Sequence, residues 1–370
     1  MSSPTSEQAA RRALIITHTP EDGTVLEGTT RADDLYHWLR SQGWNYRRTV
    51  GDFRLQASPN KPAKRHAIDR TAEGLRTRGF DVHIEIDDTV RTFADAEADR
   101  AVNAELRAER LDGRSGRLSA ASDARERAGR VVVDGIPPGQ PYLVDHPGYA
   151  ADRNRRERAF KNLEMAAELG SLAEKIAEQA KTAGNHMAYR HNPETVVNRI
   201  REFEAEQRRI AREVERGDVI ERLFAGADEA RHQQLREQYG VSPFTTEHRQ
   251  QLAVRAEWLE EQLRGWQSVR EQQIADGKAT DYTKDTFAKG DFVQRRGDWY
   301  PVLKVNKVSV TGPPPNGGWT GTVRFEHITD HVRSGDERWE NAKAKAIVTG
   351  TRYVGNCGPH ASIKALMDEQ

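Results

Sequence analysis

Two stretches of the chain carry apolar residues at alternating steps of four and three. This is the spacing of a helix that buries one narrow stripe. It predicts two long helices that either fold back on each other or each pair with a second chain, which makes self-association or a protein partner one expected use of this region. The stripes are Val196, Ile200, Phe203, Gln207, Ile210 and Val214, and then Leu252, Ala256, Leu259, Leu263 and Trp266.

Composition agrees with long solvated helices. Of the 370 residues, 36% are hydrophobic and 31% are charged, which is too polar for one compact globule. Lys+Arg and Asp+Glu both number 57, so any attraction to nucleic acid must come from local charge. A single cysteine excludes an internal disulfide and a cysteine-based zinc site. No apolar run approaches the ~20 residues of a membrane span and no signal-peptide core is visible, so we expect a cytoplasmic protein without membrane association.

The pattern predicts an α+β protein in three parts. Residues 13–88 read as a small domain with the element order ββαββαβ. Residues 89–284 read as a helical and coiled-coil region with a Pro/Gly joint at 135–141, and residues 286–332 as five short strands of an SH3-like barrel. Residues 334–370 read as a short helix followed by a tail. Within the helical region, Gly113 and Gly116 predict an interruption of the first helix.

Local signals set the element order of the first domain. Asp22-Gly23 is a tight-turn pair, and two helices end at glycines that are followed by aromatic residues. The segments "LRSQGW" and "LRTRGF" match position by position, which either reflects a ββα duplication or is a coincidence of helix ends.

The stretch "NYRRTVGDFRLQ" at residues 45–56 predicts a second hairpin with Gly51-Asp52 as a two-residue turn. This register pairs Val50 with Phe53 and Arg48 with Leu55. Alternation then divides the hairpin into two faces. The face expected to pack on the helices is Trp44, Tyr46, Arg48, Val50, Phe53 and Leu55; the polar face, on which no carboxylate is expected, is Asn45, Arg47, Thr49, Arg54, Gln56 and Ser58.

A basic surface follows from this alternation. Arg47 and Arg54 point outward, and Lys61, Lys64 and Arg65 lie just beyond them at the start of the next helix. Arginine side chains and helix N-termini both favour phosphate. The five residues are therefore the predicted nucleic-acid contacts, and Tyr46 is available for base stacking if it lies at the rim. The alternative is an ordinary solvated surface.

The chain resembles a family of uncharacterised actinobacterial proteins that carry a domain of unknown function and are often encoded on plasmids and mobile elements. The resemblance rests on "ITHTPEDGTVLEGT", "GWNYRRTVGDF", "AKRHAIDRTAEGLRTRGFDVHIEIDDT" and "GQPYLVDH". It covers most of residues 13–162 and implies a mobile-element context without an activity. Residues 32–87 are also distantly similar to the small HARP domains of DNA-annealing helicases, through a helix, an aromatic-basic hairpin and a second helix.

Catalytic signals are weak. No Gly-rich phosphate loop, nucleophile elbow or paired-carboxylate motif is present, and no histidine pair has the spacing of metal ligands, so no cofactor or metal is expected. Cys357 and His360 lie in a tail, which is a poor place to hold an oriented base. The aromatic residues of the third part read mainly as core, although they could offer a binding face: Trp299, Tyr300, Trp319 and Phe325.

Three functions remain open at this level. The leading hypothesis is a non-enzymatic modular protein that binds nucleic acid or a nucleoprotein partner. The second is a coiled-coil scaffold that binds only proteins. The third is a nuclease or other hydrolase that uses His18, Asp22 or Asp52.

Overall fold

The computed structural model describes residues 13–29, 34–48, 50–313, 320–352 and 365. They divide into two compact units. Phe93–His191 forms one unit, and the residues before Phe93 and after His191 together form the other. The architecture is mixed α+β, as the sequence predicts, with a long helical middle between strand-containing ends.

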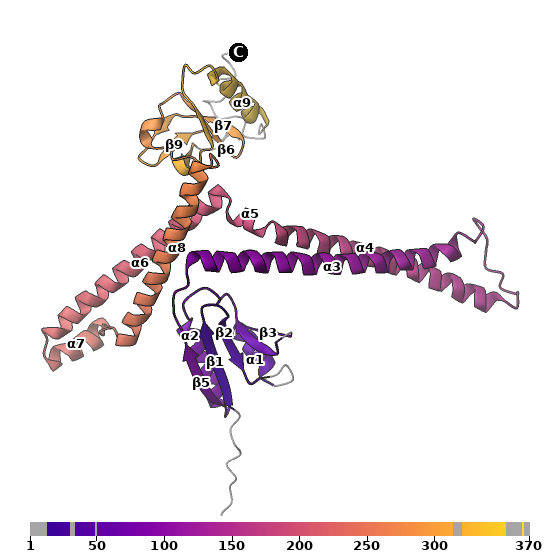
Figure 1. Ribbon diagram of the computed structural model, residues 1–370, viewed down its shortest axis with the longest axis horizontal. Helices are drawn as coiled ribbons and strands as arrows, with labels where there is room; N and C mark the ends of the chain where they lie inside the picture. The colour runs from indigo at the N-terminus through magenta and orange to yellow at the C-terminus, as the bar shows by residue number, and fades with distance from the viewer. Residues whose placement is uncertain (1–12, 30–33, 49, 314–319, 353–364, 366–370) are drawn as a thin grey trace, which may run out of the picture. The chain divides into compact units, whose positions relative to one another are not determined.

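The N-terminal domain has the predicted element order (Figure 1). Its strands form one sheet in the order β3-β4-β2-β1-β5, in which β1 and β5 are parallel and the other neighbours are antiparallel. The elements are β1 (Ala13–Thr19), β2 (Gly23–Glu27), α1 (Leu35–Ser41), β3 (Trp44–Arg47), β4 (Asp52–Leu55), α2 (Arg65–Thr77) and β5 (Asp81–Ile86).

Helices α1 and α2 pack their apolar sides onto this sheet. Trp44 is fully buried, and its indole N–H donates to the Thr71 hydroxyl at 3.1 Å. Thr71 in turn donates to the carbonyl of Ala67, so the indole is anchored to the middle of α2. The core of the domain is Leu14, Ile16, Leu26, Leu35, Leu39, Trp44, Phe53, Leu55, Ile68, Ala72, Leu75 and Val82.

The predicted register of the second hairpin is wrong. Trp44 pairs with Leu55 and Arg47 pairs with Asp52, so Gly51-Asp52 is not a two-residue turn. Gly51 adopts a φ of +84° and donates its N–H to the carbonyl of Arg47 at 2.8 Å, which closes the longer turn. Asp52 thereby enters the strand on the same face as Arg47. The polar face does carry a carboxylate, contrary to expectation.

The second unit is a helical hairpin. Helices α3 (Phe93–Val133) and α4 (Tyr149–Gly184) run antiparallel, followed by α5 (His186–Arg190) (Figure 1). Small residues allow the two long helices to approach closely: the hydroxyls of Ser115 and Ser122 donate to carbonyls of α4 at 2.8 and 2.7 Å. Alanines recur every seventh position along the buried stripe of α4, at 159, 166, 173 and 180.

The two glycines that predict a break in α3 do not interrupt it. Gly113 and Gly116 lie inside a continuous helix of 41 residues. Each glycine lowers helix stability by about 1 kcal/mol, a cost that packing against α4 can offset. Gly129 has a different role, because a Cβ there would lie 2.7 Å from a side-chain carbon of Leu163 on α4.

An ion-pair cluster joins the two ends of the hairpin. Glu97 accepts hydrogen bonds from Arg190 at 2.6 and 2.7 Å and from Arg100 at 2.5 Å, and it lies 3.3 Å from the His191 ring. Burial alone would raise the pKa of Glu97, but the hydrogen bonds and charge of Arg190 outweigh it and lower that pKa. The charged carboxylate therefore holds the start of α3 to the end of α5.

Of the two predicted arrangements of the later helices, the structure shows them folded back on each other. Helices α6 (Pro193–Ala225) and α8 (Thr246–Ala275) pack on each other within the chain, with α7 (Glu229–Tyr239) between them in sequence. Asn192 caps α6 by accepting the N–H of Glu194, and Pro193 occupies the first helical position, as predicted.

The packed stripe on α6 departs from the predicted one at Gln207 and again after Ile210. Val214 is 37% exposed and Gln207 is exposed, whereas Gly217, Ile220 and Phe224 are buried. The reason is that this part of α6 packs against α7 and Phe244, whose ring would lie 2.7 Å from a Cβ at Gly217. On α8 the predicted stripe holds, with Leu252, Leu259 and Trp266 buried.

The C-terminal region contains two three-stranded sheets, β10-β9-β8 and β11-β6-β7. No closed barrel is formed by the strands of the described residues, so the SH3-like barrel is not found in that form. The elements are η1 (Lys284–Thr286), β6 (Phe292–Arg295), β7 (Asp298–Pro301), β8 (Lys304–Val305), β9 (Ser309–Gly312), β10 (Gly321–Arg324), η2 (Phe325–His327), β11 (Asp330–Val332) and α9 (Trp339–Arg352).

Helix α9 covers one side of these strands. Ala342 and Ala346 are buried against Phe292, Trp299 and Val332. A second core on the other side contains Phe287, Val293, Val302, Val310, Phe325 and Ile328. The sequence predicts a short helix here, but its packing against the strands is a finding of the structure. Among the described helices, none combines the length and hydrophobicity needed to cross a bilayer.

Candidate nucleic-acid interface

Arg47 and Arg54 lie on one face of the β3–β4 hairpin, as alternation predicts, but both are engaged. Arg47 forms a two-point ion pair with Asp52, with its Nε 2.6 Å from the carboxylate. Arg54 donates to Asp22 at 3.0 Å. Burial and then the charge of Arg47 lower the pKa of Arg54, so the two guanidinium groups are close enough to repel each other. The two carboxylates offset that repulsion.

Lys61 and Lys64 form a second pair of neighbouring cations. Lys64 donates to the carbonyl of Gln56 at 2.7 Å, which is a neutral acceptor. Burial and then the charge of Lys61 lower the pKa of Lys64. Within the described part of the chain, neither lysine has a carboxylate within 4.0 Å. This pair therefore lacks the compensation that Arg47 and Arg54 receive.

Arg65 begins α2 and is held by a carboxylate. Its guanidinium donates to Asp88 at 2.7 Å and lies 3.9 Å from Glu247. Asp88 also accepts the backbone N–H of Ala63 at 2.8 Å. One carboxylate thus fixes both the loop that carries the lysines and the first side chain of α2.

Lys61, Lys64 and Arg65 line a cavity of about 460 Å³, which we call the α2 pocket. Trp258 on α8 forms part of its wall and donates its indole N–H to the carbonyl of Asn60 at 2.9 Å. Arg255 also faces it and is ion-paired with Glu206. The lining residues are Lys61, Pro62, Ala63, Lys64, Arg65, Asp88, Gln251, Val254, Arg255 and Trp258. Four of them are basic and one is acidic, so the pocket favours an anion.

A buried histidine lies behind this pocket. His18 on β1 is 1% exposed, and its Nδ1 hydrogen-bonds with the Thr24 hydroxyl at 2.9 Å. Its Nε2 lies 3.8 Å from a carboxylate oxygen of Asp88 and has no hydrogen-bond partner among the described residues. Burial lowers the pKa of His18, and the Asp88 charge opposes that shift only in part. The ring is therefore neutral near neutral pH.

Tyr46 packs largely on the hydrophobic core. Its ring centroid is 5.1 Å from that of Phe53 and 6.3 Å from that of Tyr36. The side chain is half-buried. Its exposed part is the portion that a base could contact.

The residues of the hydrolase hypothesis do not form a connected set. Asp22 binds Arg54 and Asp52 binds Arg47, while the contacts of His18 are Thr24 and Asp88. No hydrogen bond or ion pair joins His18, Asp22 and Asp52 to one another in the described ranges. Those ranges also contain no cluster of three metal-ligating side chains.

Cys357, His360 and Trp319 lie outside the described residues. Trp299 and Phe325 are buried in the two C-terminal cores, and Tyr300 is half-buried. These aromatic side chains serve packing, as the sequence favours.

Comparison with known proteins identifies one domain. Residues 99–221 match the family described as a domain of unknown function (DUF3560). The match begins in α3 and ends in α6, so it contains none of the residues that line the α2 pocket. No curated protein and no solved structure matches the chain.

Proposed function

We propose that this protein binds nucleic acid through its phosphate groups, with the α2 pocket as the principal contact. The observation that carries the proposal is the pair Lys61 and Lys64, two adjacent cations without a carboxylate partner in the described ranges. A phosphate between them would remove their mutual repulsion. Charge-assisted hydrogen bonds to phosphate are about twice as strong as neutral ones.

The rest of the pocket supports the same ligand. Arg65 stands at the N-terminus of α2, where the helix dipole also favours an anion. The Trp258 indole forms part of the wall, and aromatic rings in such grooves stack on unpaired bases. We therefore expect single strands to bind more tightly than duplexes.

Arg47 and Arg54 belong to the proposed surface as secondary contacts. A phosphate that binds either of them has to compete with Asp52 or Asp22, so each contributes less than a lysine of the pocket. Tyr46 is proposed only as a stacking residue at the rim. The resemblance to plasmid-borne proteins is the reason for expecting a role in mobile-element biology.

One observation favours a second candidate, a scaffold that binds protein. The α3–α4 hairpin exposes apolar side chains on both helices: Val102, Leu106, Phe160 and Leu172. A helical partner with a complementary apolar stripe would bury them. This candidate needs no basic pocket.

The test measures binding of the full chain to labelled single- and double-stranded DNA at several salt concentrations. Replacing Lys61 and Lys64 with alanine should weaken binding and flatten its salt dependence. For each phosphate that the variant no longer neutralises, the log-log slope should fall by about 0.7 on a single strand and by about 0.9 on a duplex. Folding should change little, since exposed charges contribute little to stability.

The matched control removes two other exposed lysines, Lys289 and Lys307. It changes the net charge by the same amount, but neither lysine lines the α2 pocket. Affinity and slope should therefore stay unchanged. Equal reductions in affinity for both double variants would mean that only bulk charge matters. Unaltered binding in the Lys61/Lys64 variant, or no DNA binding by the wild type, would favour the scaffold.

A further inference from the structure

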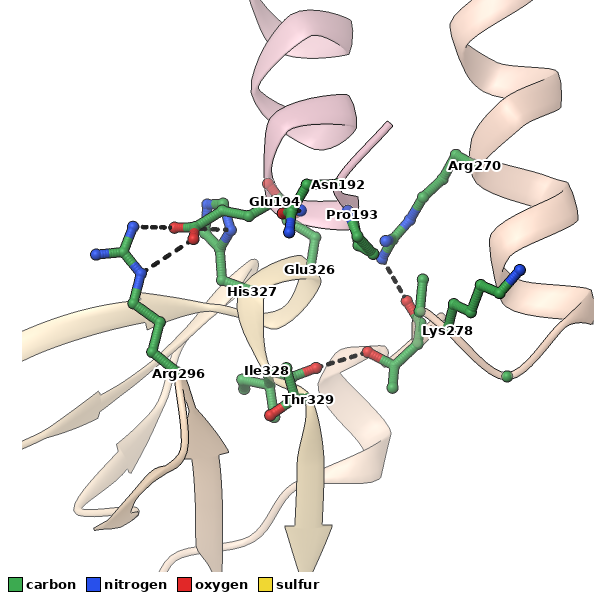
Figure 2. A pocket seen from close by; sticks show the side chains of 13 residues that line it. Asn192, Pro193, Glu194, Arg270, Lys278, Arg296, Glu326, His327, Ile328 and Thr329 are labelled. Atoms are coloured by element: carbon green, nitrogen blue, oxygen red, sulfur yellow. Dashed lines mark hydrogen bonds and ion pairs between the residues drawn. The ribbon is translucent and has the colours of Figure 1, made fainter. Parts of the chain in front are cut away.

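A second cavity, of about 260 Å³, lies where α6 begins and η2 ends, and we call it the α6 pocket (Figure 2). Asn192, Pro193 and Glu194 from the start of α6 form one wall. Arg270 projects toward the cavity from α8, and the segment after α8 closes that side. The remaining lining residues are Gly277, Lys278, Ala279, Thr280, Arg296, Glu326, His327, Ile328 and Thr329.

Both glutamates of the α6 pocket are already neutralised. Glu194 accepts hydrogen bonds from Arg296 at 2.7 and 3.0 Å and from Arg295 at 3.1 Å, as the dashed lines in Figure 2 mark for Arg296. Hydrogen bonds from Arg296 in particular hold the pKa of Glu194 below its usual value. Glu326 is ion-paired with Arg201. Each carboxylate is therefore paired with an arginine, and the charge of Glu326 also acts on Arg270.

Arg270 is a half-buried cation that is hydrogen-bonded to a neutral group. Its guanidinium donates to the carbonyl of Thr280 at 2.7 Å (Figure 2). Among the described residues, none places a carboxylate within 4.0 Å of it. A guanidinium carries five N–H donors, and this is the one hydrogen bond that they make to the described residues.

His327 is the second unsatisfied group. Its side chain is 10% exposed, yet within the described ranges its Nδ1 has no hydrogen-bond partner and lies 3.9 Å from the nearest oxygen of Glu194. Burial, followed by the charges of Arg201 and Arg295, lowers the pKa of His327, so the ring is neutral near neutral pH. A buried polar atom of this kind is destabilising unless a ligand or water satisfies it.

We propose that the α6 pocket binds a small oxyanion such as phosphate, held by Arg270 and His327. Three basic side chains line the pocket, Arg270, Lys278 and Arg296, against the two glutamates, so its net charge favours an anion. The cavity is slightly smaller than the 300–1,000 Å³ typical of drug-sized ligands, so the oxyanion is free or attached to a small molecule. The N-terminal end of α6 adds a favourable dipole.

The experiment titrates inorganic phosphate into the full-length protein at constant ionic strength and mildly alkaline pH, with isothermal calorimetry as the readout. Arg270→Gln should weaken phosphate binding by about tenfold or more, because it removes a charged hydrogen-bond donor. His327→Leu should also weaken it. The matched control is Arg264→Gln on the same helix, where the arginine is exposed and paired with Glu260 and Glu261, and it should bind as the wild type does.

Two further arms make the result decisive. The variant with Lys61 and Lys64 replaced by alanine should still bind phosphate at the α6 pocket. If that variant loses phosphate binding while Arg270→Gln keeps it, the phosphate site is the α2 pocket and the proposal is overturned. Hydrogen exchange on the wild-type protein requires no substitution. Phosphate should protect residues 277–280 and 326–329, and unchanged exchange in both segments would overturn the proposal whatever the variants do.

Discussion

Replacing Trp44 with alanine tests whether the N-terminal domain is built around one indole ring. The ring is fully buried between the sheet and the helices, and its N–H is bonded to Thr71. Removing a buried tryptophan costs about 3–5 kcal/mol, because burial is reduced and a cavity is left behind. Trp38 provides the control, because it is only half-buried and stacks on Arg78 at 4.2 Å, so Trp38→Ala should cost about 1 kcal/mol.

The hydrogen bond can be separated from the packing. Thr71→Val keeps the shape of the side chain but leaves the Trp44 N–H buried without an acceptor, which should cost about 1–3 kcal/mol. Once Trp44→Phe has removed that N–H, the same change at Thr71 should cost about 1 kcal/mol less. The difference is the coupling energy of the pair in a double-mutant cycle.

The assay is native-state hydrogen exchange on the full chain, followed in peptides from α2. A local measurement is needed because the long helices dominate any whole-chain signal. A destabilisation below about 1 kcal/mol for Trp44→Ala, or equal destabilisation by Trp44→Ala and Trp38→Ala, would refute the reasoning. If the costs of the changes at Trp44 and Thr71 simply add in the double-mutant cycle, the hydrogen bond between them is refuted, but the burial of Trp44 is not.

Three other outcomes are expected. Because the pKa of His18 is lower in the folded state than its unfolded value of about 6.5, the N-terminal domain should lose stability as pH falls below about 6.5, and His18→Gln should reduce that loss in a hydrogen-exchange pH series. Ile210→Asp should cost several kcal/mol of α6–α8 stability in urea unfolding and Val214→Asp less than about 1, whereas equal costs would restore the predicted heptad. Gly129→Ala should lower the melting temperature of the α3–α4 hairpin and Gly116→Ala should raise it slightly, and the reverse order would contradict the close approach at Gly129.

Local signals explain why much of the fold was predictable. A turn such as Asp22-Gly23 and a helix end such as Gly43 act over a few residues, so the order of elements in the N-terminal domain follows from the sequence. The register of the second hairpin depends on a longer-range balance. Shifting the turn lets Asp52 meet Arg47 across the strands, and that gain is not visible in the turn residues alone.

The candidate sites depend on contacts between distant segments. The sequence identifies Lys61, Lys64 and Arg65 as basic, but not which of them would lack a carboxylate. That distinction depends on Asp88, which reaches Arg65 and not the lysines. Trp258 stands one position before a predicted seam residue, and nothing in the local pattern directs it toward Asn60. Pairing partners of this kind are set by tertiary packing.

The compact unit that combines the residues before Phe93 with those after His191 is synthesised in two parts, separated by the α3–α4 hairpin. Asn60 and Trp258, which meet at the α2 pocket, are 198 residues apart. At 5–20 residues per second, a ribosome takes roughly 10–40 s to make the intervening chain. During that time the α3–α4 hairpin can form from its own contacts, while the two lysines are already exposed. A nascent or prematurely terminated chain would present the cations without the aromatic wall, so competence for the proposed ligand arises only late in translation.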